Sequence, residues 1–268
     1  MTSLRPIYAP ALVRKPAFHL RYAWSGWPSS RSFPSLPSPD FLNDLDEQWE
    51  ADGIRRLETS WSGERIQFVF SVRPQVSPEL FVNRVKGRLQ HHLRKSGLPS
   101  DFSRKVAFRT IGRNRTADVA NYIRGQVHAG RFVDPAFAAQ LRQFTVSDPT
   151  IDLSLPTATV RGRYWYNLHV VLVVAQRGLI RDLETLRTID RWCPAICNKM
   201  DAGLAHRSLM PDHLHLAIRG NIQDSPEEIA LSLMNNLAFA IGQKAIWQPS
   251  YYAGTFGEYD MNAVRQND

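Results

Sequence analysis

The feature that most constrains the fold is an internal repeat. Residues 68–89 and 214–237 share one pattern: an apolar strand, a loop, Ser-Pro-Glu, and a helix with apolar periodicity. Ser77 and Ser225 are the expected N-caps, because each precedes a proline at the first helical position. In the first helix, apolar residues recur every four positions from Phe81, which predicts one buried stripe.

The repeat continues downstream and upstream of these segments. Thr110-Ile111-Gly112 matches Thr255-Phe256-Gly257 at an offset of 145 residues. First strands are expected at 17–27 and 164–174, and each is followed by a helix, at 38–53 and 180–199. Each copy therefore reads strand, helix, strand, strand, helix, short strand, helix. That order predicts an α+β fold, with a four-stranded antiparallel sheet and helices on one face in each copy.

The repeat also predicts the domain organisation. We expect a first unit at 1–130, a Pro- and Ser-containing linker at 131–160, and a second unit at 161–268. The chain has 268 residues and is 43% hydrophobic, enough for two such units.

Composition excludes several classes of protein. No apolar run approaches the roughly 18 residues that span a bilayer, and the N-terminal residues contain no secretory signal. The spacing of Cys193 and Cys197 is not that of a redox pair or a zinc site, so we expect buried, reduced thiols. These features predict a cytoplasmic protein without a membrane partner.

The net charge of +8 is concentrated in one region. Residues 51–131 contain 16 Lys and Arg against 6 Asp and Glu. A one-sided bias mixed with aromatics favours a phosphate-binding surface over a merely solvated face. The expected DNA-contacting side chains are Arg84, Lys86, Arg88, Arg94, Lys95, Arg113 and Arg115. The tryptophans considered for base stacking are Trp24, Trp27, Trp61, Trp165 and Trp247, with core packing favoured for the last two.

The most suggestive short motif is His213-Leu214-His215 in an apolar run. In a strand, residues two apart point to the same face, so the two imidazoles can face one metal ion. The alternative is a pair of polar residues facing solvent, and the spacing alone does not decide between them.

The surrounding residues carry a resemblance. "MPDHLHLAIRG", the following "SPEE", and "IWQPSYYAGTFGEYDMNAVR" resemble the HUH-type single-tyrosine transposases of bacterial insertion sequences and REP-associated elements. The resemblance is strong over about 164–266 and fainter over 17–126. It implies ferredoxin-like units and a divalent ion, Mg²⁺ or Mn²⁺, held by the two histidines. It also implies a helical tyrosine that attacks a DNA phosphate to form a 5′-phosphotyrosine link. A polar residue four positions after the tyrosine, often Gln, completes the metal site.

The family pattern is divided between the two copies. In the second copy the tyrosine position is occupied by Asn267, and Tyr251, Tyr252 and Tyr259 fall at structural positions of the family. In the first copy an offset of 146 puts Gln67 and Val69 at the histidine positions, and valine cannot bind a metal. That copy keeps Tyr122 and Gln126, four residues apart on one expected helix.

The resemblance therefore implies one composite site in a fused pseudo-dimer. Tyr122 is the expected nucleophile, and His213, His215 and Gln126 are the expected metal ligands. The expected partner is single-stranded or hairpin DNA in a bacterial, nucleoid-associated setting, and a monomeric pseudo-dimer is favoured over a homodimer. His19 and His169 are interpreted as packing or DNA-facing residues. Two alternatives stay open: a non-catalytic hairpin-binding protein, and a metal nuclease that uses water.

Overall fold

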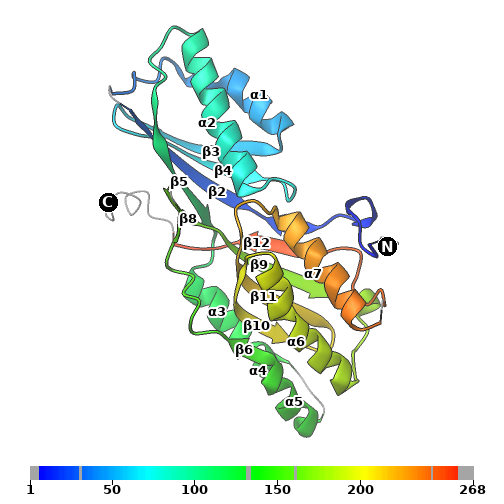
Figure 1. Ribbon diagram of the computed structural model, residues 1–268. Helices are drawn as coiled ribbons and strands as arrows, with labels where there is room; N and C mark the ends of the chain where they lie inside the picture. Colours follow the sequence, from blue (N-terminus) through cyan, green and yellow to red (C-terminus); the bar gives the residue numbers. More distant parts are fainter. Residues whose placement is uncertain (1–5, 30–31, 131–133, 160–161, 243, 259–268) are drawn as a thin grey trace.

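The computed structural model describes residues 6–29, 32–130, 134–159, 162–242 and 244–258, and it has an α+β fold (Figure 1). Seven α-helices and two six-stranded sheets lie within these residues. The α+β class was expected, but each sheet has two strands more than the four predicted. The additional strands also introduce parallel pairs, β1 (Ala17–His19) with β12 (Tyr252–Thr255) and β5 (Phe102–Ile111) with β8 (Gly162–Trp165).

The first sheet is built mainly from the first half of the chain. Its strand order is β3-β4-β2-β5-β8-β7, and helices α1 and α2 cover one face. The bounds are β2 Arg21–Pro28, α1 Asn43–Ala51, β3 Ile54–Trp61, β4 Ile66–Val72, α2 Pro78–Lys95, β5 Phe102–Ile111, β7 Thr157–Thr159 and β8 Gly162–Trp165.

The second sheet repeats the same arrangement. Its order is β1-β12-β9-β11-β10-β6, and α6 and α7 cover one face. The bounds are β1 Ala17–His19, β6 Thr145–Ser147, β9 Asn167–Val173, α6 Leu183–Lys199, β10 Gly203–Leu209, β11 His213–Arg219, α7 Pro226–Ala240 and β12 Tyr252–Thr255. In both sheets, the first strand of the repeat lies between the third and the fourth strands.

The two sheets exchange strands, which explains their six-strand size. The expected first strand of each half is divided, at Leu20 in one and at Tyr166 in the other, and both of these residues are buried. The short leading piece pairs in parallel with the last strand of the other half. Phe18 of β1 lies beside Ala253, and Phe108 lies beside Tyr164 of β8. Each half therefore completes the sheet of the other.

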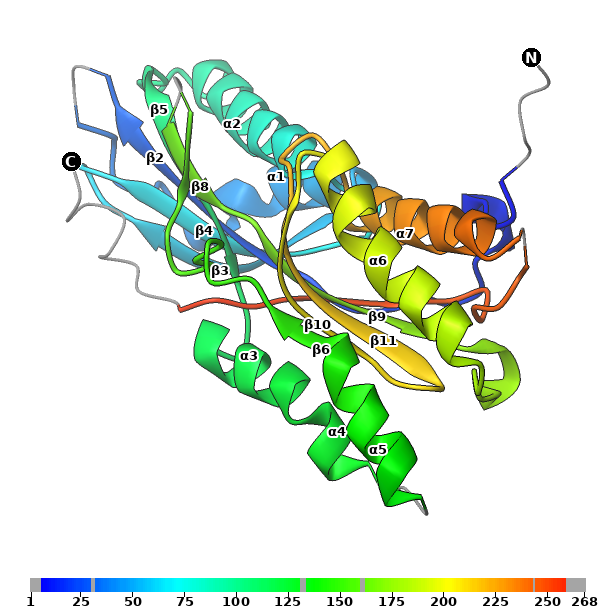
Figure 2. The same ribbon diagram turned by 60° about the horizontal axis from the view of Figure 1, so that its bottom comes forward.

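The helices form two layers on opposite faces of the sheets. Helices α1, α2, α6 and α7 lie on one side, and α3 (Thr116–Arg124), α4 (Gln126–Ala129) and α5 (Pro135–Leu141) lie on the other (Figure 2). The segment predicted to be a linker contains α5, β6 and β7; β6 pairs with β10 at the edge of the second sheet, and β7 pairs with β8 at the edge of the first.

Local sequence explains the helices of the first layer. Ser77 Oγ accepts a hydrogen bond from Leu80 N at the start of α2, and Ser225 forms a reciprocal capping box with Glu228 at the start of α7. The predicted stripe in α2 is fully buried, as expected; it consists of Phe81, Val85, Leu89 and Leu93.

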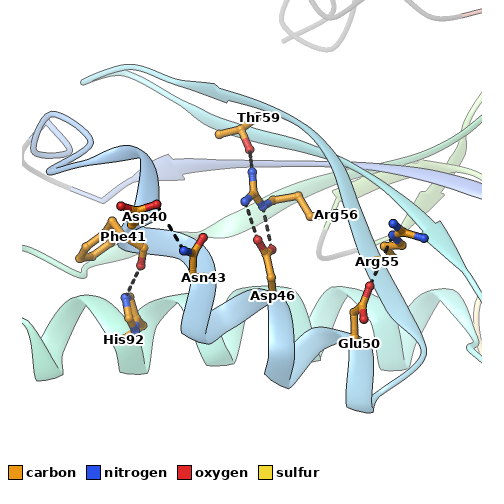
Figure 3. A network of polar contacts seen from close by, with 9 residues as sticks. All are labelled: Asp40, Phe41, Asn43, Asp46, Glu50, Arg55, Arg56, Thr59 and His92. Carbon is orange, nitrogen blue, oxygen red and sulfur yellow. Dashed lines mark hydrogen bonds and ion pairs between the residues drawn. The ribbon is translucent and has the colours of Figure 1, made fainter.

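Polar contacts attach α1 to its neighbours (Figure 3). The Arg56 guanidinium of β3 donates to both oxygens of Asp46 in α1, at 2.8 and 2.5 Å, and to Thr59 Oγ1 at 2.6 Å. His92 of α2 lies 2.8 Å from the carbonyl oxygen of Phe41, in the turn before α1. These contacts fix the helical layer to the outer strand of the first sheet.

Several compositional expectations can be compared with this fold. Cys193 and Cys197 are buried free thiols in α6, as predicted, and burial raises the pKa of Cys197 to about 12. Trp24 and Trp247 are fully buried, so the stacking role considered for Trp24 is wrong, and the core role favoured for Trp247 is confirmed. Every helix in the described residues is too short or too polar to cross a bilayer.

Candidate active site

The candidate site forms where α3 leaves the first half and packs on the second sheet. Val119 and Ile123, four residues apart, are buried against Ala205 of β10, Ala217 of β11 and Phe256. Helix α3 lies on the face of the sheet opposite α6 and α7 (Figure 2). Burial of this stripe holds the Tyr122 helix over the strand that carries the two histidines.

Tyr122 and Gln126 do not belong to one uninterrupted helix. Helix α3 ends at Arg124, Gly125 has φ −81° and ψ −6°, and Gln126 begins α4. The Gln126 Nε2 group donates to the carbonyl oxygen of Tyr122 at 3.1 Å, which holds the side chain in place. The predicted proximity of the two residues is therefore present, although the helix is broken between them.

The structure brings Tyr122 next to the histidines of the other half. The Tyr122 ring meets the His215 ring edge to face, with 5.3 Å between centroids. The His213 and His215 rings are 4.7 Å apart and nearly perpendicular. The Tyr122 side chain remains 55% exposed, whereas His215 is buried. The phenol is therefore accessible to a large substrate while its imidazole neighbour is shielded.

His213 lies between two oxygen atoms. Its Nδ1 lies 2.7 Å from Asp212 Oδ1, and its Nε2 lies 3.4 Å from Gln126 Oε1. A carboxylate only accepts, so Nδ1 carries a proton, and in the neutral ring Nε2 has a lone pair. Two lone-pair atoms then face each other, Nε2 of His213 and Oε1 of Gln126. This arrangement suits a cation bound between them.

His215 has a neighbour that the sequence did not assign to the site. His169 Nε2 on β9 lies 3.0 Å from His215 Nδ1, and the two rings are stacked with 5.2 Å between centroids. Burial lowers the pKa of His215 to about 2 and that of His169 to about 4, so both rings are neutral at neutral pH. When Nδ1 of His215 donates to His169, Nε2 of His215 is free to bind a metal.

The donor set fits a divalent cation only if Gln126 contributes. Within the described residues, no three His, Cys, Asp or Glu side chains are arranged to hold a metal ion. Two imidazole nitrogens and one amide oxygen are acceptable ligands for Mn²⁺, and Mg²⁺ prefers oxygen. The third ligand would therefore be the Gln126 amide oxygen, from the other half of the chain.

Strand pairing corrects the predicted counterparts of the histidines. Ser25 pairs with Gln67, and its counterpart Val171, at the offset of 146, pairs with His215. Gln67 therefore corresponds to His215, and Arg65 to His213. The predicted pair, Gln67 and Val69, was displaced by two residues, because a two-residue insertion keeps the same face of the strand. In the first sheet Gln67 Nε2 donates to Ser25 Oγ at 2.9 Å, and no imidazole stands at either position.

The predicted DNA-contacting residues fall in two places. Those on α2 lie in the helical layer opposite the candidate site, and Arg84 and Arg88 approach Asp52 at 3.8 and 2.7 Å. Lys86 Nζ donates to the carbonyl oxygen of Ser103, and Arg94 Nε to Ser100 Oγ. Lys95 is exposed near the end of the same helix. Arg113 and Arg115 are exposed in the connection between β5 and α3, beside the Tyr122 helix.

The remaining tyrosines differ in their surroundings. Tyr251 is buried and donates to Glu227 Oε1, and burial raises its pKa. Tyr252 lies beside His169, with 5.7 Å between ring centroids, and burial raises its pKa too. Tyr259 and Asn267 lie outside the described residues.

His169 and the strand exchange are what sequence reasoning missed. His169 lies two positions before Val171 on β9, within an apolar run, and only the antiparallel register with β11 places it beside His215. The alternating apolar pattern around His169 could have indicated that it lies on the same face of the sheet as the His-Leu-His motif. The pattern could not have indicated that its partner is His215.

Comparison with known proteins gives one matching family model and several similar solved structures. A sequence model of the family described as "Transposase IS200 like" matches residues 163–266. A candidate transposase from Deinococcus radiodurans R1 is 17% identical, with 37% of this chain and 83% of that chain covered and a TM-score of 0.29.

Two regulatory subunits of aspartate kinase cover more of the chain at lower similarity. The Thermus thermophilus subunit is 12% identical over 86% of this chain and 97% of its own, and the Thermus flavus subunit is 13% identical over 85% and 98%. Both have TM-scores of 0.20, which are too low to indicate a shared fold. Comparison with curated proteins gives no match. Residues 163–266, which include the His-Leu-His strand, are therefore similar to the IS200-like transposases.

Proposed function

We propose that this chain nicks and rejoins single-stranded or hairpin DNA at one composite active site, through a 5′-phosphotyrosine intermediate. The observation that carries the proposal is the contact between side chains of the first half and side chains of the second half. Tyr122 and Gln126 come from the first half, and they contact His215 and His213 of the second half, at a ring distance of 5.3 Å and an atomic distance of 3.4 Å.

Each residue has a chemical role in the proposed reaction. A bound Mg²⁺ or Mn²⁺, held by His213, His215 and Gln126, would act as a Lewis acid on the scissile phosphate. The Tyr122 oxygen attacks phosphorus, the bond to the 3′ oxygen breaks, and the departing oxygen takes up a proton. Because Tyr122 is exposed, it can give its proton to solvent as it attacks. The reverse attack by a 3′ hydroxyl rejoins the strand without ATP.

The proposal includes the duplication. The repeated strand order, with the first strand between the third and fourth in each sheet, supports two tandem ferredoxin-like units. The exchanged strands β1 and β8 support a fused pseudo-dimer in which one chain supplies both parts of the site. The first unit at 1–130 would carry the tyrosine, and the second at 161–268 would carry the histidines.

The direct test is an adduct assay. Labelled single-stranded hairpin DNA is incubated with the protein and Mn²⁺ and then separated on a denaturing gel. We expect a covalent protein–DNA band that Tyr122→Phe removes. Cleavage without an adduct in the wild-type protein would replace the proposal with a water-using nuclease. Binding without any cleavage would replace it with a non-catalytic hairpin-binding protein.

A further inference from the structure

A large cavity opens beside His213. Its volume is about 840 Å³, within the range of about 300–1,000 Å³ that is typical of small-molecule sites. Three segments line it: the end of α4 with α5, the loop at 179–181, and the turn at 210–213. The first segment comes from the half that carries Tyr122, and the other two come from the half that carries the histidines.

The cavity wall is mostly apolar away from the candidate site. Phe137, Leu179 and Met210 supply apolar surface, and Leu179 is 58% exposed. Two of the candidate metal ligands, Gln126 and His213, also line the cavity. A phosphate placed at those ligands would therefore have its neighbouring nucleoside at the mouth of the cavity.

The charges in the wall favour a base over a phosphate. Asp212 faces His213 Nδ1, and Asp134 accepts a hydrogen bond from Ala136 N at the start of α5. Both carboxylates line the cavity, and they would repel a second phosphate group placed inside it. Arg181 is exposed in the wall and can meet the phosphate of the next nucleotide.

We propose that this cavity binds an unpaired nucleobase adjacent to the scissile phosphate, with Leu179 and Phe137 as its apolar walls. The inference rests on the proposed function for its orientation relative to the cut. A base within a duplex is stacked and paired, so only an unpaired or flipped base can enter such a cavity. The cavity would thus select single-stranded DNA at the point of cleavage.

The test uses two leucines of equal exposure. Leu179 lines the cavity and Leu155 does not, and both are 58% exposed, so substitution of either leaves the buried core intact. The probe is fluorescein-labelled single-stranded oligodeoxythymidine of about twelve nucleotides, and binding is read by fluorescence anisotropy. We expect Leu179→Asp to weaken binding about tenfold, because one stacked base is worth about 1–3 kcal/mol. Leu155→Asp should stay within about twofold.

A second measurement locates the base. Oligodeoxythymidine containing 4-thiothymidine is cross-linked to the wild-type protein by light, and the modified peptide is identified by mass spectrometry. Cross-links to 126–130, 134–137, 179–181 or 210–213 support the proposal. Unchanged binding by Leu179→Asp, or cross-links only elsewhere, would overturn it.

The two proposals can fail separately. If the wild-type protein forms the Tyr122 adduct and Leu179→Asp binds single strands normally, the cavity proposal is wrong and the nicking proposal stands. If no adduct forms but binding still depends on Leu179, the cavity binds a base in a protein that does not cut DNA.

Discussion

Thr110 and Thr255 make matching hydrogen bonds across the boundary between the two halves. Thr110 Oγ1 accepts from Asn167 N at 2.9 Å and donates to the carbonyl oxygen of Phe256. Thr255 Oγ1 accepts from Arg21 N at 2.8 Å and donates to the carbonyl oxygen of Ile111 at 2.6 Å. The partners differ by the same offsets, 145 or 146 residues, as the repeat. The conspicuous Thr-x-Gly repeats therefore lie at a local pseudo-twofold contact.

Substitution of Gly112 should destabilise this contact. An added Cβ would lie 2.2 Å from the carbonyl oxygen of Thr255, and backbone cannot move aside cheaply. We expect Gly112→Ala to lower the free energy of unfolding by about 1–3 kcal/mol, measured by urea denaturation. The matched control is Gly87→Ala in α2, where nothing lies within 4 Å. That change should stabilise by about 0.5–1 kcal/mol, because glycine is unfavourable inside a helix. Equal effects would contradict a close contact at Gly112.

Removal of either predicted imidazole ligand should stop cleavage. His213→Ala and His215→Ala each remove one of three ligands, so we expect loss of the adduct and of calorimetric Mn²⁺ binding. Hairpin binding should change by less than about fivefold, since metal ligands contribute little to the phosphate contacts that dominate affinity. Tyr122→Phe is the control, because it should lose the adduct and keep Mn²⁺ binding. Cleavage by either alanine variant would show that the ion is not held there.

His169 should act by positioning His215. His169→Phe keeps an aromatic ring beside His215 but removes the nitrogen 3.0 Å from His215 Nδ1. We expect Mn²⁺ affinity to fall about 10–100-fold, the usual effect of losing a partner behind a metal-bound histidine. Adduct formation should recover when Mn²⁺ is raised to saturation. Failure to recover, with the protein still folded, would show that His169 contacts the substrate or the ion directly.

The two predicted basic surfaces can be separated by their salt dependence. Neutralisation of Arg113 and Arg115, which lie beside the Tyr122 helix, should weaken single-strand binding. The slope of log K against log salt should fall by about 0.7 for each lost phosphate contact. The comparison is the double variant Arg84→Gln with Lys95→Gln on α2, in the opposite layer. If the α2 double variant has the same slope of log K against log salt as the wild-type protein, for single strands and for hairpins, the DNA-binding role predicted for α2 is wrong.

Local features of this fold were predictable, and pairing across the sheets was not. The caps at Ser77 and Ser225 and the buried stripe from Phe81 followed from the residues themselves. The proximity of Tyr122 to the His-Leu-His strand was implied by the family resemblance together with the repeat. The division of the first strands at Leu20 and Tyr166 could not be predicted, because the local sequence of a strand does not determine which strand it pairs with.

The same limit explains the errors at the site. A two-residue slip preserves the face of a strand, so the sequence offset could not distinguish Val69 from Gln67 as the counterpart of His215. His169 stood in an apolar run that reads as core, and its role depends on the β9–β11 register. Trp24 was considered for base stacking because it occurs in a chain rich in basic residues. Nearby basic residues in a sequence do not indicate whether a tryptophan is exposed or buried.

The central claim is that one chain builds the whole site, and mixing two inactive variants tests it most directly. Tyr122→Phe and His213→Ala are mixed at micromolar concentration, and adduct formation on hairpin DNA is measured against each variant alone. Because the connecting segment keeps the halves at an effective concentration of about millimolar, pairing between chains should not compete. The mixture should therefore stay inactive, since every molecule has one damaged composite site. Recovery of the adduct in the mixture would contradict the claim and show that the tyrosine of one chain serves the histidines of another.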